Sequence, residues 1–251
     1  VGPFPSVEEK EPNNEAAKAQ PVALNSTVQG TIGSEDVDVF SVEVKKDQRL
    51  SVEIEGARLG RTLFDPTVTV LSADGRVLAA SDDTPLLGHD GFVSLLAPAD
   101  GKYLIQVRDM TYAGTGHFYR LHLGTFPRPA AVFPLGGQPG ETLEAKFLGD
   151  PTGDFTQPIT LPTEKSRSAR FGLVADHHGL APSPNWLRIS PLANAPSITP
   201  GNTLGKATAL NTTAPLAFNG VLTTKGDAAF FRFTAKKDQS LDFQVYARRL
   251  G

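Results

Sequence analysis

The chain has 251 residues, a net charge of −3 at pH 7 and no cysteine. The weakly acidic balance leaves no basic stripe and argues against nucleic-acid binding. The absence of cysteine excludes a disulfide framework and thiolate metal sites, but it does not fix the compartment. No run approaches the roughly 18 apolar residues of a membrane span, so we expect no membrane insertion in this segment. Because the first residue is Val1 and the sole methionine is Met110, we expect any signal peptide to lie outside this piece.

In chain order, a linker (residues 1–14) is followed by a short predicted helix at residues 15–20 and then by a β pattern that continues to residue 125. Apolar and polar residues alternate on both sides of Lys46-Asp47-Gln48, which predicts a hairpin of two half-buried strands. Strands with Gly and Asp turns between them, at roughly ten-residue spacing, favour a β-sandwich or jelly roll. They are predicted at residues 40–45, 50–55, 67–71, 76–80, 92–96, 103–107 and 118–123.

A second, smaller β unit is predicted after Gly124. Residues 126–129 read Phe-Pro-Arg-Pro and form a stiff linker, since each proline holds its predecessor extended. Strands are then expected at residues 141–148, 157–161, 169–175 and 186–189, within a unit that ends near Leu192. A unit of about 60 residues is small for an independent core, so we expect it to lean on a neighbour.

The chain also repeats itself, because residues 227–251 align without a gap on residues 36–60. Such self-similarity is the signature of repeated modules. We therefore predict an all-β protein of tandem sandwich modules, with an entrance linker (1–14), a first sandwich (15–125), a small β domain (126–192) and a truncated second copy (193–251). Residues 230–233 and 241–245 should pair as a hairpin around Lys237-Asp238-Gln239. An isolated hairpin is marginal in water, so the second copy should be loosely ordered or pack its apolar face on a neighbour.

The entrance linker carries a candidate metal site. In an extended backbone Glu9, Glu11 and Asn13 lie on one face, because strand side chains alternate with period 2, and Pro12 favours that geometry. Two carboxylates and an amide oxygen on one face repel one another unless a cation lies among them. Ca²⁺ takes roughly six to eight oxygens in irregular geometry, and two acids near the first long strand, Asp36 and Asp38, could complete that set. The alternative is a solvated acidic linker.

Several motifs of residues 7–124 occur in the order of a known family. These motifs are Glu11-Pro12-Asn13-Asn14, Asp36-Val37-Asp38-Val39-Phe40, the run from Phe64 to Val70, Ala79-Ala80-Ser81-Asp82-Asp83, Asp100-Gly101-Lys102-Tyr103 and Val107-Arg108-Asp109. Together they resemble the bacterial pre-peptidase C-terminal (PPC) domain, a β-sandwich module of many secreted peptidases and large planctomycete surface proteins. Residues 127–192 are similar to the Ig-like insert between two such modules in planctomycete proteins, through Pro139-Gly140-Glu141-Thr142 and Pro184-Asn185-Trp186.

The resemblance implies calcium bound between the entrance linker and an acidic loop, as in the collagenase version of this domain. The predicted ligand set is Glu9, Glu11, Asn13, Asn14, Asp36 and Asp38. In the second copy both linker glutamates are missing from residues 197–202, and the position of Asp38 is taken by Ala229. We therefore predict calcium in the first copy only.

The remaining candidates favour structural roles. Asp65, Asp82, Asp83 and Asp90 are more typical of turns and caps than of a second ion site. The five histidines lack metal-ligand spacing, and there is no HExxH, GxSxG or phosphate-cradling glycine loop, so we expect no enzyme activity in this segment. Aromatic residues could in principle form a carbohydrate platform, but Trp186 is better explained as a packing anchor, and Tyr103 and Tyr119 as core or rim residues.

These features predict a non-catalytic, calcium-stabilised interaction module of a larger secreted or cell-surface bacterial protein. The alternatives are an accessory segment for targeting or maturation of a secreted peptidase, or a module that binds collagen or polysaccharide. The expected partners are an extracellular protein or polysaccharide and the other domains of the same chain.

Overall fold

The computed structural model describes residues 4–61, 63–84, 86–163, 169–195, 201–210, 215–222, 224–247 and 250. Within these ranges the chain is all-β, and its helical segments are three short 3-10 turns: η1 (Ala16–Lys18), η2 (Ala57–Leu59) and η3 (Leu204–Lys206). In this part of the chain no helix has the length and apolar character needed to cross a membrane. The predicted all-β class with sandwich-like modules is confirmed.

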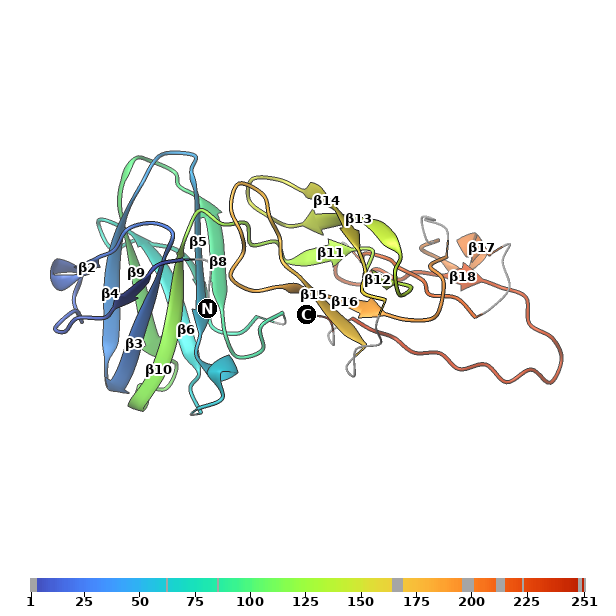
Figure 1. Ribbon diagram of the computed structural model, residues 1–251, viewed down its shortest axis with the longest axis horizontal. Coiled ribbons are helices and arrows are strands. Elements are labelled where there is room, and N and C mark those ends of the chain that lie inside the picture. The colour runs from blue at the N-terminus through green and yellow to red at the C-terminus, as the bar shows by residue number, and fades with distance from the viewer. Residues whose placement is uncertain are drawn as a thin grey trace.

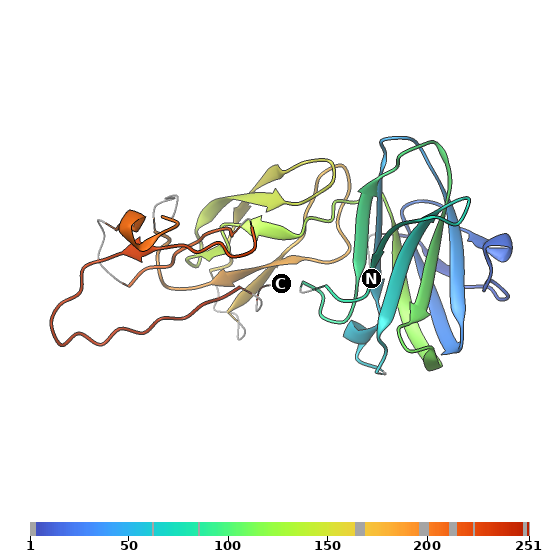
Figure 2. The same ribbon diagram turned by 180° about the vertical axis from the view of Figure 1, so that it is seen from behind.

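The first module is a sandwich of two five-stranded sheets, with the orders β1-β3-β10-β5-β8 and β2-β4-β9-β6-β7. Figures 1 and 2 show the two sheets face to face, with the smaller units at one end of the molecule. The strands are β1 (Ser6–Glu8), β2 (Gln20–Pro21), β3 (Ser26–Ser34), β4 (Val37–Val44), β5 (Arg49–Glu55), β6 (Pro66–Ser72), β7 (Val77–Ser81), β8 (Phe92–Leu96), β9 (Gly101–Asp109) and β10 (Ala113–Gly124).

The core of this sandwich follows from the alternating pattern of its strands. Apolar side chains at every second position of β4, β5, β9 and β10 lie between the sheets. Phe40, Leu50, Ile54, Ile105 and Leu121 are each 0% exposed. Burial of each such side chain contributes about 1.5–3 kcal/mol of transfer free energy, so this shared core is the main source of stability.

Two local predictions for the first module are wrong. Residues 45–48 do not close a hairpin, because β4 pairs with β2 and β9 in one sheet, whereas β5 pairs with β10 and β8 in the other. The turn is therefore an arch between sheets. The helix predicted at residues 15–20 is only the turn η1, and its end enters β2, where Gln20 and Pro21 pair in parallel with Phe40 and Ser41 of β4.

The second module consists of two three-stranded sheets with the orders β11-β13-β14 and β12-β16-β15. Its strands are β11 (Ala131–Phe133), β12 (Gly136–Gly137), β13 (Thr142–Leu148), β14 (Phe155–Thr160), β15 (Arg170–Leu173) and β16 (Asn185–Ile189). It has its own small core, in which Ala145, Phe147 and Leu187 are each 0% exposed.

Buried charges join the two modules. The guanidinium of Arg49 on β5 donates to Asp150 Oδ1 at 2.8 Å and to the carbonyl oxygens of Thr125 and His177. The side chain of Arg49 is 4% exposed and that of Asp150 is 0% exposed. Ion pairs so deeply buried persist only when the remaining donors are satisfied, as they are here. The small module therefore packs against the sandwich through buried contacts, as its small size predicts.

A second buried charge cluster lies at the same junction, around Glu53 of β5. Its carboxylate contacts Arg128 Nε at 2.6 Å and Arg58 NH2 at 3.0 Å. Ser183 of the small module donates a hydrogen bond to the same carboxylate. Burial lowers the pKa of Arg128, and the neighbouring charge of Arg58 lowers it as well, whereas Glu53 raises it.

The second copy is attached to the small module. Asn194 donates to the carbonyl oxygen of Gly136 at 2.8 Å, and Asn219 accepts from the backbone of Leu135 at 2.9 Å. Its described strands are β17 (Thr208–Ala209) and β18 (Phe231–Arg232), which pair in parallel. The predicted hairpin of residues 230–233 with 241–245 is wrong, because residues 241–245 carry no strand and β18 pairs with β17 instead.

Candidate metal centre

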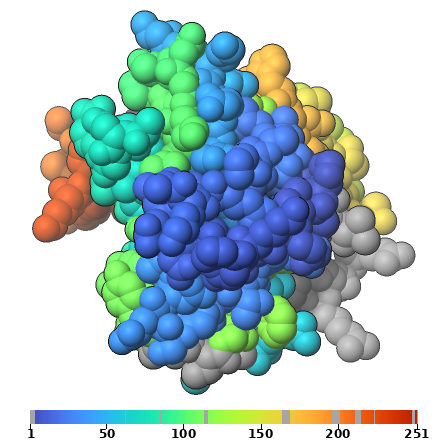
Figure 3. Space-filling model, turned by 90° about the vertical axis from the view of Figure 1, so that its left-hand side faces the viewer, coloured from blue at the N-terminus to red at the C-terminus, as the bar shows by residue number. Residues whose placement is uncertain are grey.

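The entrance linker is laid across the first sandwich. β1 pairs in parallel with β3, and the next backbone amide, that of Glu9, donates to Gln29 O at 3.0 Å. Further along, Asn13 O accepts from Val39 N of β4 at 3.1 Å. Figure 3 shows this first part of the chain, in dark blue, lying over the surface of the sandwich. The linker thus spans both sheets and brings its acids to the start of β4.

Three carboxylates meet at this point. Ligand oxygens of Glu9, Glu11 and Asp38 all lie within 4.8 Å of one another. Hydrogen bonds hold the linker acids in place: Thr31 N donates to Glu9 Oε2 at 2.7 Å, and Asn13 N donates to Glu11 Oε2 at 2.8 Å. Asn13 Nδ2 also donates to Glu9 Oε1 at 3.2 Å. The linker pattern and the β4 acid, predicted to share a site, do come together.

Asp38 is the buried member of this group, at 0% exposure. Its Oδ2 accepts a hydrogen bond from Tyr119 Oη on β10. Within the described residues its Oδ1 has no hydrogen-bond partner, and neither does Oδ1 of Asn13, which is also 0% exposed. Because a buried acceptor without a donor costs about 1–3 kcal/mol, two such oxygens beside three acids indicate a place for a cation.

Electrostatics supports the same conclusion. Burial, the contact with Glu9 and the negative charge of Asp36 together raise the pKa of Asp38 from 3.8 to about 9, although the hydrogen bond from Tyr119 lowers it. Burial and the charge of Asp38 also raise the pKa of Tyr119. A carboxyl group in this position is therefore either protonated or balanced by a nearby cation. Carboxylate and amide oxygens are the donors that Ca²⁺ prefers, so the residues present fit a calcium ion.

Asp36 and Asn14 lie beside the three carboxylates but face each other. Asp36 Oδ2 accepts from Gly33 N at 2.9 Å, and its Oδ1 accepts from Val37 N at 2.9 Å and from Asn14 Nδ2 at 2.7 Å. Each oxygen is therefore engaged by an amide donor in the turn before β4. Asp36 contributes negative charge near Asp38, which raises the pKa of that residue.

Two features of the site have no signal in the local sequence. Tyr119 lies 81 residues from the acid that it positions. It packs over Gly30 on the adjacent strand β3, where an added Cβ would lie 2.3 Å from the tyrosine ring. Only glycine leaves room for this side chain at its observed position.

The other acids behave differently. Asp90 is buried and accepts from the backbone amides of Gly56 and Ala57, which is the predicted capping role. Asp65, Asp83 and His89 have ligand atoms within 4.8 Å of one another. Oδ1 of Asp65 is buried without a hydrogen-bond partner among the described residues, but the side chains of His89 and Asp83 are 73% and 63% exposed, so we assign no ion to this group.

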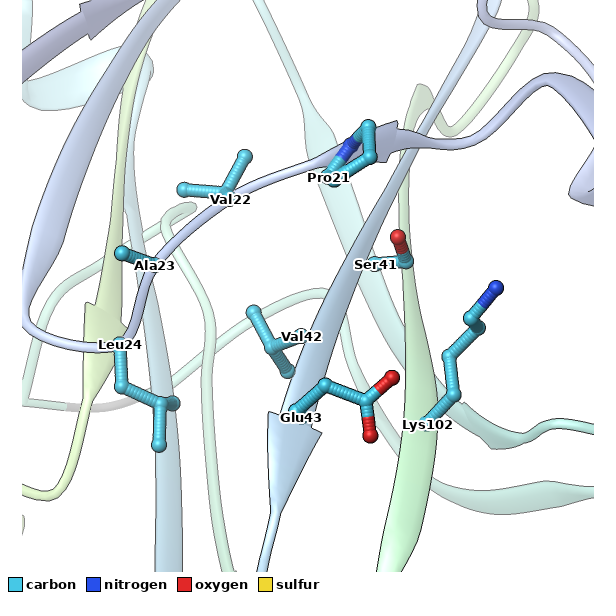
Figure 4. Close-up of a pocket in the computed structure, with 8 residues that line it drawn as sticks. All are labelled: Pro21, Val22, Ala23, Leu24, Ser41, Val42, Glu43 and Lys102. Atoms are coloured by element: carbon cyan, nitrogen blue, oxygen red, sulfur yellow. The ribbon is translucent and has the colours of Figure 1, made fainter.

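The aromatic candidates are structural. Tyr103 is 3% exposed and Tyr119 is 1% exposed, so both belong to the core, as predicted. Trp186 is half-buried, and the guanidinium carbon of Arg170 lies 4.4 Å from its ring centroid. A separate shallow groove, drawn in Figure 4, lies where β2 leaves β4, with the charged side chains of Glu43 and Lys102 on its rim.

Part of the first sandwich matches a known protein family. Residues 36–109 match the bacterial pre-peptidase C-terminal domain, so this part of the chain is a PPC domain. Such domains are non-catalytic modules that are typical of the C-terminal parts of bacterial secreted peptidases. The predicted resemblance is confirmed for these residues. No curated protein matches the chain.

The solved structures similar to this chain include three bacterial proteins. The pre-peptidase C-terminal domain of collagenase from Bacillus anthracis shares 19% identity at a TM-score of 0.36, over 46% of this chain and 99% of its own. PliG of Aeromonas hydrophila, a periplasmic inhibitor of g-type lysozyme, shares 20% identity at a TM-score of 0.33, over 42% of this chain and 96% of its own. CorA of Methylomicrobium album BG8, a surface-associated copper-binding protein, shares 10% identity at a TM-score of 0.29, over 43% of this chain and 98% of its own.

Proposed function

We propose that residues 4–125 form a calcium-binding PPC sandwich that acts as a non-catalytic interaction module of an extracytoplasmic bacterial protein. The PPC match at residues 36–109 supports the class of module and its extracytoplasmic setting. The observation that carries the calcium proposal is the unpartnered Oδ1 of the fully buried Asp38, beside the carboxylates of Glu9 and Glu11.

In this proposal Glu9, Glu11, Asp38 and the amide oxygen of Asn13 hold the ion. A bound calcium ion supplies positive charge that neutralises these acids. The chain's own residues then determine what binding achieves: the linker acids belong to residues 9–13, whereas Asp38 belongs to β4. Neutralising them together fixes the linker on the sandwich and so sets the direction in which the chain approaches it.

Calcium binding should also stabilise the fold by linkage, because the unfolded chain does not hold these oxygens together. At a free calcium concentration 100 times Kd, the gain is about 2.7 kcal/mol. For a protein of this size that gain corresponds to about 5–10 °C in Tm.

The test is thermal unfolding of the whole chain in calcium and in chelator, for the wild type and for Asp38→Asn. The wild type should melt higher in calcium, and the variant should lose that difference. Glu43→Gln is the matched control, because it removes an exposed carboxylate from the same strand. An unchanged wild-type Tm on calcium addition, or an Asp38→Asn variant that keeps the full shift, would overturn the proposal.

The family match also favours a second role, that of an accessory segment of a secreted peptidase. The two roles differ in what the same polypeptide carries. Sequencing the reading frame on both sides of this segment distinguishes them: a peptidase domain supports the accessory role, whereas further sandwich repeats support a surface interaction protein.

A further inference from the structure

Residues 4–9, which we call the strap, run from the junction of the two modules to the candidate metal centre. At one end the ring of Phe4 stacks on that of Phe126, with the centroids 5.5 Å apart and 29° between the planes. At the other end Glu9 belongs to the metal centre, where its Oε2 accepts from Thr31 N at 2.7 Å. In Figure 1 this part of the chain, in dark blue, begins on the side of the sandwich next to the small module and runs away from it.

Phe126 is part of the junction itself. It is 1% exposed, and its carbonyl oxygen accepts from Ser51 Oγ of β5 at 2.8 Å. On the side of the small module, the backbone of Gly179 comes so close that an added Cβ would lie 3.6 Å from Phe126 Cα. Phe4 therefore packs on the residue at which the sandwich, the inter-module linker and the small module meet.

Between its two ends the strap is held chiefly by its backbone. β1 pairs in parallel with residues 27–29 of β3, at the outer edge of its sheet. Of its three side chains, those of Ser6 and Glu8 are exposed and that of Val7 is half-buried. An edge strand with few buried apolar contacts opens locally at a low cost in free energy. The position of the strap therefore depends on what holds its two ends.

The charge at the metal centre acts on one of these ends. Ligand oxygens of Glu9, Glu11 and Asp38 lie within 4.8 Å of one another, so their mutual repulsion favours release of the linker unless a cation neutralises them. Glu9 follows Phe4 by only five positions, which is about 17 Å of extended chain. Because β1 keeps this short segment extended, fixing Glu9 on the sandwich also places Phe4 on Phe126.

We propose that the strap couples the metal centre to the junction, so that calcium binding holds Phe4 on Phe126 and strengthens the contact between the sandwich and the small module. This inference rests on the proposed calcium site. Its two states are a docked and a frayed strap, and calcium favours the docked one because only that state brings the linker acids to Asp38. Such coupling is reciprocal: the factor by which calcium favours the Phe4–Phe126 contact is the factor by which that contact favours calcium binding.

The first measurement is a calorimetric titration of the chelator-treated full chain with calcium chloride. Phe4→Ala should weaken calcium binding by about fivefold or more, since typical couplings between two sites begin near that value. Phe218→Ala is the matched control, because the ring of Phe218 stacks on that of Phe231 in the second copy, with the centroids 5.0 Å apart and 28° between the planes. This control should leave the affinity for calcium unchanged.

The second measurement is amide hydrogen exchange, with rates expressed relative to the core amides of β13 so that the global gain in stability cancels. Glu9 N reports the strap, and His177 N, which donates to Gly179 O at 3.1 Å in the loop next to Phe126, reports the junction. Calcium should slow both amides of the wild type by about fivefold or more. In Phe4→Ala it should still slow Glu9 N but no longer His177 N.

The outcomes separate the coupling from the calcium site itself. An absence of calcium binding by the wild type would overturn the proposed function and this inference with it. Equal calcium affinity in the wild type and Phe4→Ala, with no change at His177 N, would overturn the coupling alone and leave the calcium site in place. Weaker binding by Phe4→Ala without any calcium effect at His177 N would confine the effect to the strap, and it would also overturn the coupling.

Discussion

Glu53 is the residue whose replacement most sharply tests how the two modules are joined. Its side chain and that of Arg128 are both 0% exposed, and they lie 2.6 Å apart. Glu53→Gln keeps the shape but removes the charge that balances Arg128 and Arg58. Removing one partner of a buried ion pair costs about 3–5 kcal/mol, and glutamine retains one acceptor, so we expect about 3 kcal/mol. At about 2–4 °C per kcal/mol, the Tm should fall by about 6–12 °C.

The assay is thermal unfolding followed by the fluorescence of Trp186, the sole tryptophan, and by near-UV circular dichroism of the whole chain. Both signals should shift, because the cluster links the modules. Asp154→Asn is the control in the small module: its side chain is 41% exposed and that of its partner Lys146 is 51% exposed, so little stability should be lost. Equal shifts for the two variants would refute the reasoning.

Further predictions concern the metal site and the junction. Gly30→Ala should displace Tyr119, lower the Tm and weaken calcium binding, and a calcium titration of a folded Gly30→Ala variant with wild-type affinity would contradict this. At the junction, burial raises the pKa of Asp150, but hydrogen bonds from Thr152 and Arg49 outweigh it and hold the pKa below its usual 3.8. The contribution of Asp150 is therefore present above about pH 4 and lost as pH falls through the lowered pKa. Asp150→Asn should therefore reduce the loss of unfolding free energy between pH 5 and pH 2, measured by denaturant titration at each pH. An unchanged pH dependence in this range would count against the assignment.

The alternating patterns identified most strands of the first sandwich but not their partners. Period 2 says that one face of a strand is buried; it does not say which sheet the strand joins. The strands on either side of residues 45–48 were therefore predicted to pair, although β4 and β5 lie in opposite sheets. The same reasoning failed for residues 230–245, where the arch is reproduced without a ladder between its flanks. β3 also lay outside the predicted strands.

The local sequence pattern also could not predict that the polar face of β5 is buried. Arg49 and Glu53 occupy positions that alternate with core residues, which normally indicates solvent exposure, yet they are 5% and 0% exposed. The small module covers this face of the sheet, and that contact joins residues more than 100 positions apart, as in the pair of Arg49 with Asp150. Sequence spacing cannot reveal a contact of this kind.

The candidate metal site was more accessible to prediction. The two-residue spacing of Glu9 and Glu11 grouped the two linker acids correctly, and Asp38 joins them, although residues 11–12 form a bend rather than the expected extended strand. The spacing could not separate Asp38 from Asp36, because the latter precedes β4 and gives its oxygens to turn amides.

The most direct test of the central claim is a calorimetric titration of the chelator-treated full chain with calcium. We predict a stoichiometry of about one calcium per chain for the wild type, because the first copy alone keeps an oxygen set suited to this ion. Asp38→Asn should remove that binding, whereas Glu43→Gln should retain it. No binding by the wild type, or binding that survives Asp38→Asn unchanged, would contradict the account.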